Sequence, residues 1–191
     1  MLKDMDLSRF DSMEPSELKS YLAFLLWHYR VMDSFWFLYL AEEQGQTAAE
    51  QLNERVWARV SGLAARDLVT RFQVTEKGLE GFVEVLRLYP WTALLGYQIE
   101  QSPDEVVVTV PCCDTQEARR RRGLEEYLCA DMHRREFMGI AGEVDPSIQV
   151  HCDFAPPGQR PAGLDCRWRF TIGAEPAEAR PVTARAADGS S

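Results

Sequence analysis

The chain has 191 residues, which suits a single compact domain, and its 46% hydrophobic content is ample for a sizeable core. The net charge of −9 opposes binding to a phosphate backbone, because that affinity comes mostly from lysine and arginine. The composition therefore predicts a globular protein and argues against nucleic acid as a partner.

The first twenty residues lack the basic region and short apolar run of an export signal, so we expect a cytoplasmic protein. Five cysteines are an odd number, which makes a complete disulfide framework unexpected in such a chain. Reduced thiols are therefore expected.

The first expected helix covers residues 14–44. Its apolar residues recur at three- and four-residue steps: Leu18, Leu22, Leu25, Tyr29, Met32, Trp36 and Leu40. Further apolar residues widen this surface, which predicts a central, buried helix. A membrane span is not expected, because His28, Arg30 and Asp33 lie near the middle of the apolar stretch, where charges are costly in hydrocarbon.

More helices are expected in the N-terminal half. The apolar spacing predicts one over residues 48–60, another near 63–72, and a fourth that begins near residue 76 and ends before Pro90. Beyond Pro90, residues 96–113 are rich in β-branched side chains around a Ser-Pro-Asp turn, which predicts a hairpin.

The C-terminal half continues with helix and then strand. Residues 115–144 have a helical pattern, with a break at Gly123 left open, and residues 148–172 predict two more strands. The expected fold is α+β, with an N-terminal helical layer packed on a small, mostly antiparallel sheet and a crossover helix that carries Cys129. Residues 1–172 form a single domain, and the Ala/Pro/Gly/Ser-rich residues 173–191 predict a disordered tail.

Two cysteines lie at strand positions whose side chains are expected to face the core. In the last two strands, alternation places Cys152 on one face with Ile148, Val150 and Phe154, and it places Cys166 with Trp168, Phe170 and Ile172. Cys129 precedes His133 by four residues, which stacks both side chains on one helical face.

These cysteines have two interpretations. The candidate ligand set is Cys113 (or Cys112), Cys129, Cys152 and Cys166, with His133 in reserve. Four thiolates suit zinc or, less well, an iron–sulfur cluster, whereas three with an open position suit a catalytic metal or a reactive thiol. The chain has no C-x-x-C motif, and free cysteines are often ordinary core residues, so both interpretations stay open.

Two charged features are further candidates. Asp33 is either a general base or metal ligand in a pocket lined by Trp27, Trp36 and Trp57, or the partner of Arg30 or a later arginine in an ion pair. In the arginine run at 119–122, salt bridges with nearby glutamates account for most of the charge, and one arginine is available to bind a substrate carboxylate bidentately.

Four stretches carry a resemblance to a known family: "MDSFWFLYLAEEQGQTAAEQLNERVW", "PCCDTQEARRRRGLEEYLC", "VHCDFAPPGQRP" and "DCRWRF". They resemble an uncharacterised bacterial family of small cytosolic proteins that is distantly similar to the L-2-amino-thiazoline-4-carboxylic acid hydrolase-like proteins. The matching positions are Asp33, Trp36, Phe37, Trp57, Cys113, Gln116, Glu117, Arg119, Gly123, Cys129, Cys152, Pro156, Pro157, Cys166, Trp168 and Phe170. The chain departs from the pattern at Ser34, where glycine is expected, and at Phe154, where some relatives carry cysteine.

The resemblance strengthens the cysteine set without naming a reaction, and two functions compete. One is a hydrolase-like enzyme that acts on a small molecule through a thiolate-bound metal or a nucleophilic cysteine, with Asp33 and His133 as catalytic residues. The other is a non-catalytic ligand-binding or sensor domain with a structural zinc or a redox-sensitive cysteine cluster. We expect a small, carboxylate-bearing ligand and no membrane or nucleic acid partner, and a homodimer stays open.

Overall fold

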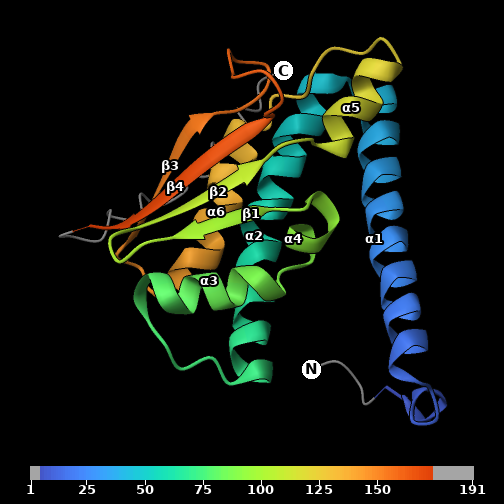
Figure 1. Cartoon of the computed structure of the whole chain (residues 1–191). Coiled ribbons are helices and arrows are strands. Elements are labelled where there is room, and N and C mark those ends of the chain that lie inside the picture. Colours follow the sequence, from blue (N-terminus) through green and yellow to red (C-terminus); the bar gives the residue numbers. More distant parts are fainter. Residues whose placement is uncertain (1–4, 174–191) are drawn as a thin grey trace, which may run out of the picture.

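The computed structural model describes residues 5–173. Figure 1 shows a small sheet with helices packed behind and below it and one long helix, α1, standing to the side. The helices predominate in the N-terminal half, and the sheet has four antiparallel strands. The α+β fold predicted from the sequence is therefore confirmed. Apart from Gly173, the predicted tail lies outside the described residues.

Two long helices form the N-terminal part, after a short 3-10 turn at Ser8–Phe10. Helix α1 (Pro15–Gln44) begins at Glu14, where the carboxylates of Glu14 and Glu17 each accept a hydrogen bond from the other residue's backbone N–H. Gly45, with φ of 87°, turns the chain directly into α2 (Gln46–Phe72). The two separate helices predicted at 48–60 and 63–72 are therefore one continuous helix.

The prediction that α1 is central and buried is wrong. None of its residues is buried, because it packs mainly against α2 and α4 and leaves much of its surface exposed. Trp36, for example, is 75% exposed. Periodicity showed that α1 is apolar, but it could not show how many neighbours surround the helix. No helix within residues 5–173 has the length and apolarity required to cross a membrane.

Two shorter helices connect α2 to the sheet. Helix α3 (Gly78–Leu88) buries most of its apolar residues, including Phe82, and ends before Pro90 as predicted. The chain then forms α4 (Pro90–Leu95), which the sequence analysis did not predict. Proline is compatible with this position because the first N–H of a helix has no intrahelical partner.

The sheet consists of β1 (Gln98–Gln101), β2 (Glu105–Val110), β3 (Ile148–Phe154) and β4 (Cys166–Ile172), in the order β1-β2-β4-β3. Every neighbouring pair is antiparallel, and β4 lies between β2 and β3. The hairpin predicted at residues 96–113 is therefore confirmed, and the two strands predicted within residues 148–172 pair with each other. An irregularity after Cys152 pairs Phe154 with Arg167, which moves Phe154 away from the face that carries Cys152. The expected shared face therefore ends at Cys152.

The crossover from β2 to β3 contains two helices, α5 (Asp114–Arg121) and α6 (Ala130–Val144), with a non-helical segment around Gly123. Cys129 is the N-cap of α6 and so begins the crossover helix rather than lying inside it. Helix α6 packs against both α2 and the sheet, and its Phe137 contacts Trp168 and Phe170 of β4. This packing fixes the start of α6 beside the end of α5.

Candidate functional site

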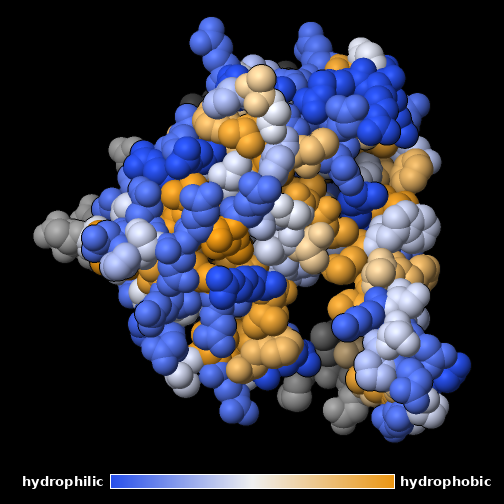
Figure 2. All heavy atoms as spheres, in the orientation of Figure 1, coloured by the Kyte–Doolittle hydropathy of each residue, from blue (hydrophilic) through white to orange (hydrophobic). Residues whose placement is uncertain are grey.

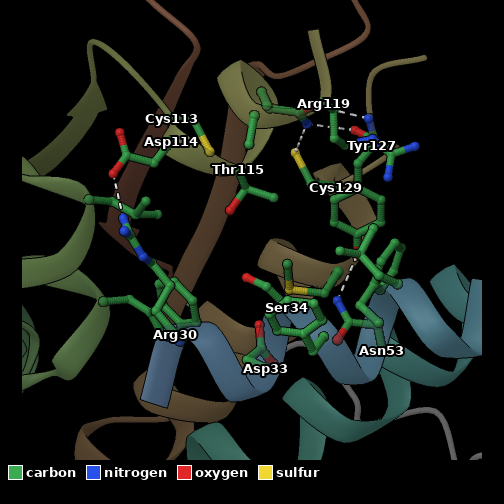
Figure 3. Close-up of a pocket in the computed structure, with 18 of the residues that line it drawn as sticks. Arg30, Asp33, Ser34, Asn53, Cys113, Asp114, Thr115, Arg119, Tyr127 and Cys129 are labelled. Carbon is green, nitrogen blue, oxygen red and sulfur yellow. Dashed lines mark hydrogen bonds and ion pairs between the residues drawn. The ribbon is translucent and has the colours of Figure 1, made fainter. Parts of the chain in front are cut away.

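A cavity of about 420 Å³ lies between α1 and the helices of the crossover, with α2 and α4 completing its walls. This volume lies within the range of small-molecule sites. Figure 3 shows the sulfurs of Cys113 and Cys129 on the side of the cavity opposite Asp33 and Ser34 of α1. The cavity thus brings together residues from both halves of the chain.

Cys113 lies at the N-terminus of α5, directly after β2 and the short Pro-Cys turn. Its backbone N–H donates a 2.6 Å hydrogen bond to Asp165, a buried carboxylate that also pairs with Arg120 and Arg160. Burial raises the pKa of the Cys113 thiol, while the backbone N–H groups of Gln116 and Thr115 oppose the rise. The strand-to-helix turn therefore holds a half-buried thiol where a helix N-terminus favours negative charge.

Cys129 is held in place by Gln116, whose side chain is almost completely buried. The Gln116 amide donates a 2.8 Å hydrogen bond to the Tyr127 carbonyl and accepts a 2.9 Å bond from the Tyr127 N–H. Its Nε2 also lies 3.6 Å from the Cys129 sulfur. Burial, followed by the nearby Cys113, raises the pKa of Cys129 to about 12, so this thiol is protonated at neutral pH.

His133 and Glu136 form a buried pair on α6, one turn below Cys129. His133 Nδ1 lies 2.6 Å from Glu136 Oε2, and the Tyr89 hydroxyl donates a 2.9 Å hydrogen bond to Glu136 Oε1. A carboxylate only accepts hydrogen bonds, so Nδ1 is the nitrogen that donates to Glu136, and in the neutral imidazole Nε2 is then the proton acceptor. Both residues line the cavity, so the pair is oriented to work as a general base.

Asp33 lines the same cavity from α1, together with Trp57 of α2 and Trp91 of α4. Burial, together with the charge of Glu136, raises the pKa of Asp33 to about 6. Within residues 5–173 no basic side chain forms an ion pair with Asp33, which excludes the predicted partner among the described arginines. A carboxyl group with such a pKa changes its protonation close to neutral pH.

Two details of the predicted Asp33 environment are wrong. Arg30 pairs with Asp114 of α5 rather than with Asp33. Trp27 and Trp36 lie outside the cavity and are exposed, so of the three predicted tryptophans only Trp57 lines it. Both errors come from the position of α1 at the outside of the molecule, where one side of the helix faces solvent.

Arg119 is the cavity residue best placed to bind an anion. Its side chain is only 8% exposed, and its Nε donates a 2.7 Å hydrogen bond to the Glu125 carbonyl. Among the described residues, no carboxylate lies within salt-bridge distance of Arg119, in contrast to its neighbours Arg120 and Arg121. A buried guanidinium without a carboxylate partner favours an anionic ligand.

The structure separates the predicted cysteine set. Cys113 and Cys129 line the cavity, and together with Cys166 they border a second, much smaller hollow of about 10 Å³ beneath it. Cys152 pairs with Trp168 in the sheet and lines neither space. Throughout residues 5–173, no three His, Cys, Asp or Glu side chains gather closely enough to hold a metal ion. The residues present thus form no ready zinc or iron–sulfur site, and metal binding stays a prediction.

The sequence analysis did not single out Glu136 or Tyr89. The spacing of His133 and Glu136, three residues apart in a predicted helix, was a usable signal because such side chains lie on one face. Tyr89 had no local signal, since its contact with Glu136 joins residues 47 positions apart.

Comparisons with known proteins show the family to which the chain belongs. The fold and the cavity define a small α+β protein with a cysteine- and histidine-bearing pocket. Residues 18–172 match the family described as a family of unknown function, DUF6125, and the chain belongs to that family. No curated protein matches the chain.

Proposed function

We propose that the protein is a hydrolase-like enzyme for a small molecule, with Cys113 as the nucleophile and His133 as the general base. The observation that carries this proposal is that Cys113 and His133 line the same cavity, with His133 oriented by the buried Glu136. A thiol, a base and a group that orients the base form one recurring arrangement for nucleophilic catalysis.

The proposed reaction is hydrolysis of an amide-type C–N bond. His133 Nε2 takes the proton from the Cys113 thiol, and the sulfur forms a bond to the carbonyl carbon. The C–N bond then breaks, and His133 returns the proton to the leaving nitrogen. Water next attacks the thioester, which releases a carboxylic acid and restores the thiol. Because burial raises the pKa of Cys113, the thiolate forms only when a base removes its proton, so His133 is essential.

The class of substrate that we propose depends on Arg119. A guanidinium that is buried in the cavity wall and has no described carboxylate partner is suited to bind a substrate carboxylate through two hydrogen bonds. Asp33, on the opposite wall, is the second group available for proton transfer, because its pKa is about 6. The proposed substrate is therefore a small carboxylate that bears a hydrolysable C–N bond.

We include in this proposal the resemblance to the thiazoline carboxylic acid hydrolase-like proteins, which strengthens the cysteine set but names no reaction. Seven of the positions that carry the resemblance line the cavity: Asp33, Phe37, Trp57, Cys113, Gln116, Arg119 and Cys129. We include a bacterial origin and a cytoplasmic location in this proposal. Zinc has no part in the proposed steps, because the described side chains do not gather three ligands in one place.

The test compares two adjacent cysteines. Cys113 faces the cavity, whereas Cys112 is exposed and lines neither hollow, so Cys112→Ala is a matched control for Cys113→Ala. Both variants are assayed with a panel of small carboxylates that contain amide or thiazoline bonds, with product detected by mass spectrometry. We expect Cys113→Ala to lose at least about a hundredfold in kcat and Cys112→Ala to match the unmodified protein. Turnover that survives in Cys113→Ala would contradict the proposal.

One observation favours the alternative, a non-catalytic ligand-binding domain. Burial is the largest cause of a raised pKa at Cys113, Cys129 and Cys166, which keeps these thiols neutral and unreactive. In that case the same panel should bind, as measured by calorimetry, without any product. Stoichiometric zinc in protein purified without chelator, lost on Cys129→Ala, would instead point to the structural metal site.

A further inference from the structure

The largest unexplained feature of the molecule is the exposed apolar surface of α1. Residues at alternating steps of four and three along this helix form one continuous row: Leu18, Leu22, Leu25, Tyr29, Met32, Trp36 and Tyr39. All of them except Tyr29 are exposed, and Tyr39 and Leu22 are 59% and 54% exposed. This row is called the α1 seam below. Its spacing is that of a helix that packs along another helix over three heptads, about 32 Å in length.

A second apolar row lies on α2, the helix beside α1. Leu52, Val56, Val60 and Leu63 fall on one side of α2, and all four are exposed. The opposite side of α2 buries Trp57, Ser61 and Ala65. The two helices are antiparallel neighbours joined at Gly45, and Figure 2 shows hydrophobic side chains beside a hollow between α1 and the body of the molecule. The two neighbouring helices therefore leave two apolar rows exposed.

The size of this surface argues against a solvated helix. Ten large apolar side chains of α1 are exposed, and at about half of the roughly 200 Å² of each side chain they present about 1,000 Å². Monomeric proteins seldom expose apolar patches above a few hundred Å², whereas one partner of a stable protein interface buries about 800 Å². The exposed area of α1 alone therefore matches that of one half of a stable dimer.

We propose that the α1 seam and the α2 row are the interface of a homodimer, in which α1 of each copy packs against α1 and α2 of the other. A second copy is the occupant that the observations favour, because a twofold interface requires the same surface on both partners and the exposed apolar area of α1 matches what one partner of a stable dimer buries. The four helices then form a bundle that buries the apolar residues which one copy leaves exposed.

This interface is independent of the proposed function. Leu22 and Trp36 of the seam do not line the cavity, whereas Cys113 and His133 do. A variant that disrupts the interface can therefore be checked for an intact fold without changing a residue of the candidate site.

Sedimentation velocity over about a hundredfold range of concentration tests the proposal. We expect the unmodified protein to sediment with a mass twice that of the 21.8 kDa chain. The double variant Leu22→Glu and Trp36→Glu should sediment with the mass of one chain, and its far-UV circular dichroism spectrum should be unchanged. The matched control is Met138→Glu, because Met138 is 51% exposed on α6, outside both rows. This control should remain a dimer.

Amide hydrogen exchange of the unmodified protein is a second test, and it does not depend on whether a variant folds. Amides of α1 and of the α2 row should become better protected as the protein associates. A protein that stays monomeric throughout the concentration range would overturn the proposal, and so would protection confined to another surface. If such a monomer bound phospholipid vesicles, the α1 seam would be assigned to a membrane surface instead.

Discussion

His133 Nδ1 lies 2.6 Å from Glu136 Oε2, and the buried carboxylate thereby links the candidate base on α6 to the hydroxyl of Tyr89. The same carboxylate acts across the cavity, because its negative charge is the second cause of the raised pKa of Asp33 on α1. Two groups from opposite walls of the cavity are therefore coupled through a residue that is 1% exposed. Such coupling between titratable groups is typical of functional sites.

The first prediction follows from this coupling. Glu136→Gln removes the negative charge but keeps the shape of the side chain, so we expect the pKa of Asp33 to fall below about 6. It should stay above the ordinary value of 3.8, because burial is the larger cause and is retained. An NMR titration of carbon-13-labelled aspartate measures this change.

Glu143→Gln is the control for that titration. Glu143 also lies on α6, but it pairs with Arg66 and does not line the cavity. The pKa of Asp33 should be the same in this variant as in the unmodified protein. An unchanged Asp33 pKa in Glu136→Gln would show that the two carboxyl groups are not coupled.

Local patterns in the sequence predicted most of the fold. The β-branched runs and the Ser-Pro-Asp turn located the hairpin at residues 96–113 and the two later strands, and apolar spacing located α1, α3 and the helical crossover. The prediction that α1 is buried was wrong because an apolar pattern shows that a helix has an apolar surface but not what covers that surface. The sequence analysis did not predict α4, because a proline such as Pro90 is compatible both with the end of one helix and with the first position of the next.

The candidate site was less predictable, since its residues come together only through tertiary packing. Cys113, Cys129, His133 and Asp33 were each named from the sequence, and the structure places all four around one cavity. Their roles as ligand, nucleophile or base stay predictions. The expectation that Cys152 joins them depended on strand alternation, which gives the face of a strand but not the position along it.

The second prediction concerns the close contact between α2 and α6. A Cβ atom on Gly139 would lie 2.2 Å from Ser61 Oγ and 3.2 Å from the Gly62 backbone nitrogen. Gly139→Ala should therefore lower the free energy of unfolding by about 1 to 3 kcal/mol through overpacking. Urea denaturation followed by circular dichroism measures the loss.

The same helix provides the control. A Cβ atom on Gly142 would meet nothing within 4 Å, so Gly142→Ala should raise the free energy of unfolding by about 0.5 to 1 kcal/mol through higher helix propensity. Equal effects of the two alanines would show that α2 and α6 do not pack at Gly139.

The third prediction separates a core thiol from a metal ligand at Cys166, which is 7% exposed beneath the cavity. As a core residue, Cys166→Ser should cost about 1 to 3 kcal/mol because it buries a hydroxyl, and Cys166→Ala should cost less. As a metal ligand, both variants would lose metal and a similar amount of stability. Cys112→Ser, at an exposed position, should change stability by less than about 0.5 kcal/mol.

The last prediction is a dependence of stability on pH that comes from Asp33. Its pKa of about 6 in the folded state is above the ordinary value of 3.8, so the folded protein binds more protons than the unfolded chain between about pH 4 and about pH 6. The free energy of unfolding should therefore fall as the pH rises through this window. Above about pH 6 the folded protein should carry the full cost of burying the charged Asp33 carboxylate. Asp33→Asn removes the titration while keeping the shape of the side chain.

We expect Asp33→Asn to exceed the unmodified protein by about 1 to 3 kcal/mol near pH 8, where Asp33 is charged, and to match it near pH 4, where Asp33 is protonated. The upper value corresponds to the full pKa shift, and partial exposure reduces it. Urea denaturation at the two pH values measures the difference. Asp67→Asn is the control, because Asp67 is exposed on α2 beside Arg71 and should give the same small effect at both pH values. A gain from Asp33→Asn that is equal at pH 4 and pH 8 would mean that the buried charge of Asp33 is not the cause.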